Sequence, residues 1–135
     1  GYSFDVKADL DQPITEADRV VAAGMGIGEE VNMGLIRELA EKTGSALGGS
    51  RPLAEVRKYI PLNRYVGVSG RKFTGSLYFA VGISGAMQHL RGIKDAKTIV
   101  AINNSESAKV FENCDYGIVG DFREVIPAII EELDK

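Results

Sequence analysis

The chain has 135 residues, of which 44% are apolar and 26% charged, and its formal net charge is -3. This composition predicts one soluble globular domain with its own core. The acidic balance argues against a nucleic-acid partner, and no apolar run approaches the ~18 residues that span a bilayer, so we expect no membrane insertion. Cys114 is the only cysteine, which excludes an internal disulfide, and one histidine with one cysteine cannot build a zinc site.

The first residues are polar and show no clear hydrophobic period. Residues 1–17 include Asp9, Asp11 and Pro13. Such a stretch is typical of a linker, and we predict that residues 1–17 are a linker or tail from an N-terminal domain, with residues 18–135 forming the ligand-binding domain.

The first half of the domain begins with a short apolar run over 19–24, which predicts a buried strand. A glycine-rich turn over 24–28 follows, then a helix over 29–43 that Gly44 closes. The pattern next predicts a strand over 45–49, a helical stretch over 51–58 and a strand over 65–69.

The second half repeats the alternation. We predict strands over 77–82, 98–103 and 116–120, with short helices over 84–91 and 105–113. The last helix ends near Leu133, and it begins either at Asp121, through a capping box with Glu124, or at Pro127. Alternation of this kind predicts an α/β fold, a Rossmann-like parallel sheet with helices on both faces. Ligands in such sheets bind at the carboxyl ends of the strands.

The turn after the first strand resembles a dinucleotide-binding loop only in part. Its spacing is G-x-G-x-G rather than G-x-G-x-x-G, and Glu29 and Glu30 follow it. Two carboxylates at a helix start would repel a phosphate. The sequence therefore favours a tight structural turn between residues 24 and 28.

The turn after the 77–82 strand is a better candidate for an anion site, because no acidic residue lies between Ser84 and Leu90. Ser84 is either a helix N-cap or a phosphate ligand. A hydrolase is not favoured, since His89, five residues later, would lie on a different face of the helix from Ser84.

Each of the other polar candidates also has an ordinary structural interpretation. Asp121 either caps the last helix or binds a ribose or an adenine amine. Arg51 is either a surface residue or lies at the ligand edge, and Asn103 can simply form a turn. A lone histidine such as His89 is more often structural than functional.

Several longer segments together resemble one family. Residues 81–90 (VGISGAMQHL), 101–103 (AIN), 115–121 (DYGIVGD), 48–52 (GGSRP) and 65–70 (YVGVSG) resemble, in order and spacing, the C-terminal FAD-binding domain of electron transfer flavoprotein alpha subunits. The resemblance extends over nearly the whole chain, from about Arg19 to Leu133. Met25 stands where members of the family often carry an arginine.

The resemblance implies FAD as cofactor and gives each matching residue a role. Arg51, Ser69 and His89 would lie around the flavin ring, Ser50 and Ser84 at the pyrophosphate and ribityl chain, and Asn103 and Asp121 at the adenosine. The complete set of implied cofactor-binding residues is Ser50, Arg51, Val66, Gly67, Val68, Ser69, Ser84, Gly85, Ala86, Met87, Gln88, His89, Asn103 and Asp121.

The function implied by the resemblance is that of an electron carrier rather than an enzyme. Its partners would be the electron transfer flavoprotein beta subunit, electron-donating flavin dehydrogenases and an electron acceptor. Its location would be the cytoplasm of a prokaryote or the mitochondrial matrix of a eukaryote. Two alternatives remain, an NAD-type dehydrogenase domain and a degenerate scaffold that only binds partners.

Overall fold

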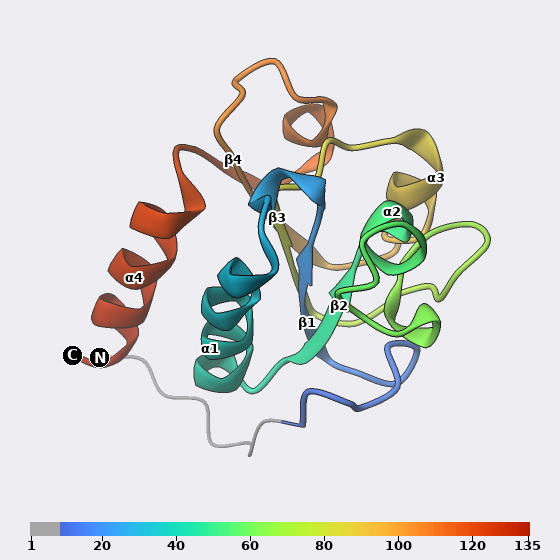
Figure 1. Cartoon of the computed structure of the whole chain (residues 1–135), viewed down its shortest axis with the longest axis horizontal. Coiled ribbons are helices and arrows are strands. Elements are labelled where there is room, and N and C mark those ends of the chain that lie inside the picture. The colour runs from blue at the N-terminus through green and yellow to red at the C-terminus, as the bar shows by residue number, and fades with distance from the viewer. Residues whose placement is uncertain (1–8) are drawn as a thin grey trace.

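The fold is built on a parallel β-sheet, and the computed structural model describes it over residues 9–135. Across these residues the sheet has five strands: β1 (Arg19–Ala23), β2 (Ala46–Gly49), β3 (Leu77–Val81), β4 (Thr98–Asn103) and β5 (Tyr116–Val119). Their spatial order is β2-β1-β3-β4-β5, and every neighbouring pair is parallel. This order is one of the common doubly wound arrangements, and it confirms the predicted α/β class (Figure 1).

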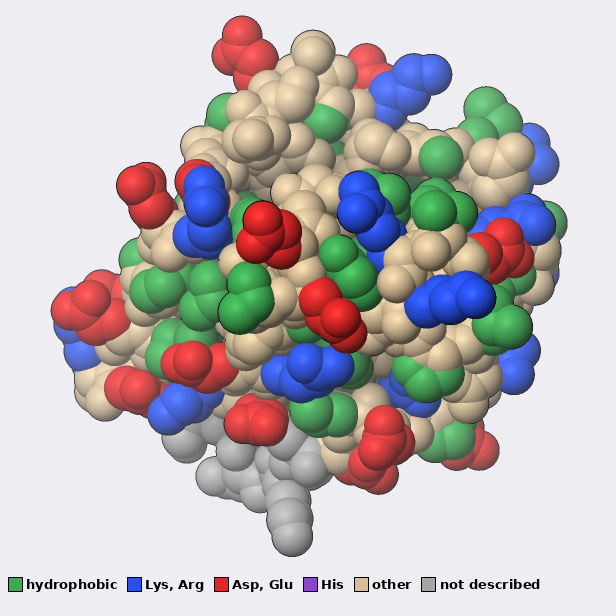
Figure 2. All heavy atoms as spheres, viewed as in Figure 1, with side chains coloured by type: hydrophobic (Ala, Val, Ile, Leu, Met, Phe, Trp, Pro, Cys, Tyr) green, Lys and Arg blue, Asp and Glu red, His purple; other side chains and the backbone are tan. Residues whose placement is uncertain are grey.

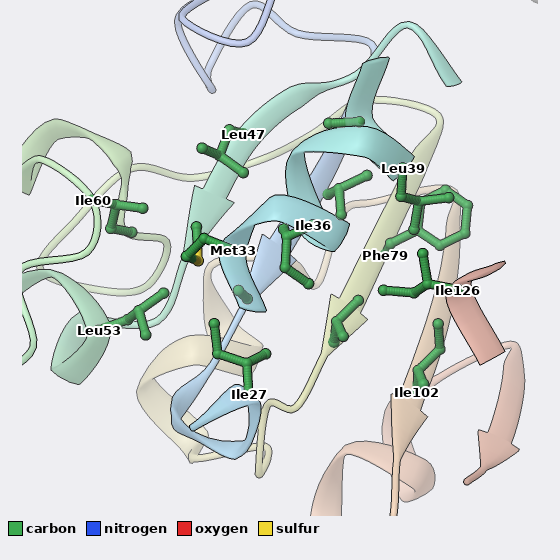
Figure 3. Packing of buried hydrophobic residues seen from close by; sticks show 14 of the residues in the cluster. Ile27, Met33, Ile36, Leu39, Leu47, Leu53, Ile60, Phe79, Ile102 and Ile126 are labelled. Atoms are coloured by element: carbon green, nitrogen blue, oxygen red, sulfur yellow. The ribbon is translucent and has the colours of Figure 1, made fainter. Parts of the chain in front are cut away.

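Strands β1, β2 and β3 are almost fully buried, which explains why their sequences are continuously apolar, whereas the edge strand β5 is largely exposed. Successive side chains alternate between two clusters: Val21 and Ala23 of β1 belong to one, and Val20 and Ala22 to the other. Figure 3 shows part of the first cluster, where Leu39 and Ile126 approach Phe79 of β3.

Two amphipathic helices cover the face of the first cluster. They are α1 (Met33–Thr43) and α4 (Phe122–Leu133), which pack against each other and lie side by side in Figure 1. Their inner positions include Ile36, Leu39 and Ile126, all fully buried. On their outer surface acidic and basic side chains are interspersed (Figure 2).

The second face is covered by shorter elements. These are α3 (Met87–Arg91), the 3-10 helix η4 (Lys109–Asn113) and irregular segments that contribute the buried Phe73, Ile93 and Val110. The remaining elements are α2 (Arg51–Glu55) and the 3-10 helices η1 (Met25–Ile27), η2 (Glu30–Asn32) and η3 (Leu62–Arg64).

The segment before β1 packs onto the sheet over the residues that are described. Ile14 and Ala17 are buried in the second cluster. Arg64 is buried nearby and donates to the carbonyl oxygens of Leu47, Asp11 and Leu10 at 2.8, 3.1 and 2.8 Å. Residues 9–17 of the predicted linker are thus tied to β2, while residues 1–8 of it lie outside the described residues and the domain boundary stays a prediction.

One predicted strand does not form. The segment over 65–69 makes only isolated bridges, Gly49 with Tyr65 and Val66 with Arg71. It contacts β2 at the last residue of that strand and then turns back, because Gly67 has a φ of 150° and the Gly70 N–H donates to the Gly67 carbonyl at 3.2 Å. A strand would need a partner along its length, and β2 ends where this segment begins.

Several helices are shorter than predicted. The helix expected over 84–91 begins only at Met87, because Gly85 has a φ of 96°, which a helix does not allow. The expected helix over 105–113 is only the five-residue η4, that over 51–58 ends at Glu55, and α1 begins at Met33 after the short η2. The last helix begins at Phe122, so the alternative start at Pro127 is wrong and this proline lies inside α4.

Candidate functional site

Two cavities adjoin at the carboxyl ends of the central strands. The larger has a volume of about 520 Å³ and the smaller about 360 Å³, both within the range of small-molecule sites. Both are lined by Gly26, Gly82 and Asn103. Gly26 follows β1, Gly82 follows β3 and Asn103 is the last residue of β4. Here the chain leaves β1 towards α1 on one face of the sheet and leaves β3 towards α3 on the other, and doubly wound sheets bind ligands at such a point.

The wall between the cavities is made of glycine backbone. The Gly24 N–H donates to the Val81 carbonyl at 2.8 Å, and the Gly26 N–H donates to the Gly82 carbonyl at 2.9 Å. A Cβ on Gly26 would lie 2.8 Å from the Gly82 oxygen, so no larger residue fits. The predicted tight turn over 24–28 is confirmed, and the same turn forms part of both cavities.

Most of the predicted cofactor residues meet at one place. The larger cavity is lined by eleven of them: Ser50, Arg51, Val66, Gly67, Val68, Ser69, Ser84, Ala86, Gln88, His89 and Asn103. Asp121 lines the smaller cavity. Gly85 and Met87 do not face either one and lie in a separate hollow beside Arg91 and Lys94.

The loop after Tyr65 forms one side of the larger cavity. The Val68 N–H donates to the Gln88 carbonyl at 3.0 Å, which holds this loop against α3. The Ser69 hydroxyl lies 3.0 Å from the Tyr65 hydroxyl, so its orientation is set by a neighbour on the same loop. Segments distant in sequence are thereby fixed on one rim.

Ser84 does not cap a helix. The N-cap of α3 is Ala86, which makes no side-chain capping bond, and Ser84 instead accepts from the Val110 N–H through its carbonyl oxygen at 3.0 Å. The N-cap interpretation of Ser84 is therefore wrong, whereas its role as a phosphate ligand stays a prediction. The extended backbone over 82–86 lines the cavity in place of a helix start.

His89 lines the larger cavity and is only 6% exposed. Its Nε2 is 2.8 Å from the hydroxyl oxygen of Tyr78, whereas its Nδ1 is buried without a partner. Burial lowers the pKa of His89 to about 4, so the ring is neutral at physiological pH. In this neutral state His89 can act on a ligand through a hydrogen bond.

Ser50 is the second residue with a buried, unpartnered polar atom. Its Oγ makes no hydrogen bond, although Ser50 occupies the N-cap position of α2. Among the described residues, the Ser50 Oγ and the His89 Nδ1 are the two buried side-chain polar atoms without a partner, and both residues line the larger cavity. Buried polar groups are ordinarily paired, so this pair marks a place where something else supplies the partners.

Arg51 is the charged residue of the larger cavity. Its Nε donates to Glu55 Oε2 at 2.9 Å, and this hydrogen bond raises the pKa of Arg51. The side chain is 58% exposed, so the pair is screened by solvent. Arg51 therefore brings a solvent-exposed positive charge to the rim rather than a buried one.

The smaller cavity is lined by charged side chains. Asp121 caps α4 by accepting from the Arg123 N–H at 2.8 Å, and it also pairs with the Arg123 guanidinium at 2.7 Å. These hydrogen bonds lower the pKa of Asp121. The predicted capping role is confirmed, although the side chain bonds Arg123 rather than Glu124. Glu29 adds a second carboxylate to this cavity.

Asn103 lies between the two cavities with its amide partly used. Its Nδ2 donates to the Ile83 carbonyl at 3.1 Å and its Oδ1 accepts from the Ser105 N–H at 2.9 Å. These bonds confirm the turn-forming interpretation. One amide hydrogen and one oxygen lone pair of Asn103 remain available to a ligand.

Sequence reasoning missed several lining residues. Tyr65, Ser105 and Ala108 line the larger cavity without having been predicted. Ser105 follows the end of β4 by two positions, so its place was available as a signal. Tyr78 was missed because it lies inside β3, where an apolar pattern gives no sign of a polar contact.

Two structural features are absent from residues 9–135. Within this range no helix is both long and apolar enough to cross a bilayer. The same residues contain no group of three or more His, Cys, Asp or Glu side chains placed to hold a metal ion.

Comparison with known proteins gives a consistent result. A family model described as the electron transfer flavoprotein FAD-binding domain matches residues 13–94. The chain is 46% identical over 130 residues to the electron transfer flavoprotein subunit alpha of Paracoccus denitrificans, covering 96% of this chain and 42% of that protein.

Two relatives from Escherichia coli agree with this result. The putative electron transfer flavoprotein subunit YdiR of strain K12 is 40% identical, over 96% of this chain and 41% of its own length. Protein FixB of strain E24377A is 44% identical, over 94% of this chain and 39% of its own length. The chain thus spans about two-fifths of the relatives it matches, and it belongs to the electron transfer flavoprotein alpha-subunit family, as its FAD-binding domain.

Proposed function

We propose that this chain holds FAD across the two adjoining cavities and serves as the flavin-carrying part of an electron relay. The observation that carries the proposal is the pair of buried, unpartnered atoms, Ser50 Oγ and His89 Nδ1, on residues that line one cavity. An unsatisfied buried polar group costs about 1–3 kcal/mol, and a ligand with matching polar atoms would remove that cost.

The larger cavity fits the flavin and ribityl part of the cofactor. Its lining combines apolar side chains such as Val66 and Ile83 with hydroxyl and amide groups, and Arg51 is the formally charged residue among those described there. An aromatic ring system needs apolar walls with a few placed polar groups. Ser69 and His89 provide such groups close to the loop that Gln88 fixes.

The smaller cavity fits an adenosine. Asp121 and Glu29 are hydrogen-bond acceptors that suit ribose hydroxyls or an exocyclic amine, and they would repel a phosphate. The pyrophosphate would then lie at the shared wall, where Gly26 and Gly82 let a ligand approach the backbone closely.

When bound, FAD supplies the exchange of electrons, while the protein supplies orientation and charge. Arg51 brings a positive charge to the rim, and Glu55 offsets part of it. His89 is neutral and offers one ring nitrogen for hydrogen bonding. No lining side chain is needed to take a proton, which supports a carrier rather than an enzyme.

The partners belong to the proposal as well. The relative from Paracoccus denitrificans is named as an alpha subunit, which supports a beta subunit as partner, and we propose flavin dehydrogenases as electron donors and a separate acceptor. The relatives are bacterial, which supports a location in a bacterial cytoplasm, and the mitochondrial matrix stays the prediction for a eukaryotic source.

The test is a titration of the purified chain with FAD, FMN and NAD. Flavin absorbance and flavin fluorescence follow the binding of FAD and FMN, and calorimetry follows the binding of NAD. We expect FAD to bind more tightly than FMN, because only FAD reaches both cavities, and NAD to bind weakly or not at all. Preferential binding of NAD would favour a dehydrogenase domain instead. Failure to bind any of the three would favour the partner-binding scaffold.

A further inference from the structure

Tyr78 does not line the larger cavity, but its hydroxyl contacts His89, which does. It is in the middle of β3, its side chain belongs to the second cluster, and it is 0% exposed. Its hydroxyl lies 2.8 Å from His89 Nε2 and makes no other hydrogen bond with the described residues. Phe73 holds the ring in place with a centroid distance of 5.4 Å.

The proton between these two groups can be placed in two ways. If His89 Nε2 donates to Tyr78, the tyrosine O–H hydrogen is buried without an acceptor, and Nδ1 is an unpaired acceptor. If instead Tyr78 donates to Nε2, the tyrosine is satisfied and only the Nδ1–H is unpaired. The second arrangement leaves one unsatisfied group rather than two, and each such group costs about 1–3 kcal/mol.

That remaining group belongs to the side chain that lines the cavity. We propose that Tyr78 is a positioning residue that donates its hydroxyl hydrogen to His89 Nε2 and so fixes the imidazole as the Nδ1–H tautomer. The consequence for the ligand rests on the proposed function: His89 offers FAD a neutral N–H donor, suited to a carbonyl oxygen or an unprotonated ring nitrogen.

Burial supports this arrangement. A doubly protonated imidazole would donate from both nitrogens and would need no tyrosine to choose between them. The low pKa of His89 excludes that form at neutral pH, because desolvation favours the neutral ring. The tautomer therefore decides whether His89 is a donor or an acceptor, and Tyr78 is the described residue that contacts Nε2.

The experiment is nitrogen NMR of the chain labelled with ¹⁵N-histidine. His89 is the one histidine in the 135 residues, so all imidazole signals belong to it. We expect the ligand-free chain at neutral pH to show a protonated Nδ1 and an unprotonated Nε2. Tyr78→Phe should lose this fixed pattern, and Tyr116→Phe, an exposed tyrosine on β5, should keep it.

The outcomes separate this inference from the proposed function. A protonated Nε2 in the unmodified chain would overturn the inference without any variant having to fold, and so would an unchanged pattern in folded Tyr78→Phe. In FAD titrations Tyr78→Phe should bind about two- to tenfold more weakly, the contribution of one hydrogen bond. Equal affinity would overturn the ligand part of the inference, whereas failure of the unmodified chain to bind FAD would overturn the proposed function and leave the tautomer result standing.

Discussion

The two cavities are built from opposite kinds of polar group. In the larger one, the polar atoms of Ser50 and His89 are buried and unpaired. In the smaller one, Asp121 is partly exposed and already satisfied by Arg123 and by the start of α4. The larger cavity thus has buried polar atoms without hydrogen-bond partners, whereas Asp121 in the smaller cavity already has its partners.

The difference shows how much each residue assignment depends on structure. An unpaired buried atom points to a missing partner, because folding alone would not leave it so. A carboxylate that caps a helix and holds an arginine has a sufficient structural reason to be there. The flavin side of the proposed site is therefore supported by geometry, and the adenosine side by the resemblance and by the position of Asp121 at the end of β5.

The largest expected effect concerns acid stability and the buried His89. Its pKa falls from 6.5 in the unfolded chain to about 4 in the folded one. Between these values the unfolded chain binds a proton that the folded chain does not, so the free energy of unfolding falls as the pH drops from 6.5 to 4. At about 1.4 kcal/mol per pH unit, the loss approaches about 3 kcal/mol at pH 4.

Urea unfolding of the ligand-free chain at several pH values measures this loss. His89→Gln serves as the comparison, since it shares every other titrating group, including Asp121. The stability of the variant should depend less on pH than that of the unmodified chain over this interval. If the free energy of unfolding changed equally with pH in both proteins, His89 would not be buried as a neutral ring. The contrast between a buried polar group in the larger cavity and an exposed one in the smaller cavity would then be lost.

The second effect concerns the wall that the cavities share. Gly26→Ala places a Cβ 2.8 Å from the Gly82 oxygen and 2.9 Å from its Cα, so backbone must move. Overpacking of this kind costs about 1–3 kcal/mol, and we expect weaker binding of both FAD and FMN because the wall serves both cavities. Melting temperature and the two titrations measure the effect.

Gly34→Ala is the matched control. Its added Cβ has nothing within 4 Å, and it lies in α1 away from both cavities. Replacing a helical glycine with alanine stabilises by about 0.5–1 kcal/mol, so this variant should gain stability with unchanged flavin affinity. If Gly26→Ala also left FMN affinity unchanged, the glycine turn would belong to the fold alone.

The third effect compares a serine that lines the larger cavity with a buried serine that lies outside it. Ser50 Oγ has no partner, whereas Ser45 Oγ is buried 2.6 Å from the Thr43 hydroxyl and lies outside the cavities. Ser50→Ala should weaken flavin binding with no loss of stability. Ser45→Ala should lose about 1 kcal/mol of stability and keep its flavin affinity. The reverse pattern would mean that Ser50 is satisfied by the protein in solution.

The sequence analysis succeeded for features that neighbouring residues determine and failed for features that depend on contacts between distant segments. All five strands of the sheet were predicted because their apolar runs are local, and the placing of polar residues at strand ends follows from the parallel sheet. The 65–69 strand was wrong because an apolar run does not reveal whether β2 is long enough to pair with it. Ser84 was wrongly expected to start a helix because the φ of Gly85 depends on its close contact with the backbone of Val110.

The contact between Tyr78 and His89 could not be predicted for a related reason. In the sequence, Tyr78 fits the apolar pattern of a buried strand, and His89 is a lone polar residue in a short helix. Only the packing of α3 against the sheet brings the two polar atoms to 2.8 Å. The family resemblance placed His89 at the ligand, but it carried no information on the residue behind it.

The smallest expected effect concerns Asp121, whose carboxylate is exposed to solvent and already paired. Asp121→Ala should weaken FAD binding severalfold and leave FMN binding nearly unchanged, because FMN has no adenosine to reach the smaller cavity. It should also lower the melting temperature, since the N-cap of α4 is lost.

Asp121→Asn separates the two roles of this residue. Asparagine caps a helix as well as aspartate does, so stability should return while the charge stays absent. Arg123→Gln removes the competing ion pair and should leave FAD affinity equal or higher. If Asp121→Ala weakened FAD and FMN by the same factor, or only lowered the melting temperature, Asp121 would be a helix cap alone and the adenosine would have to lie elsewhere.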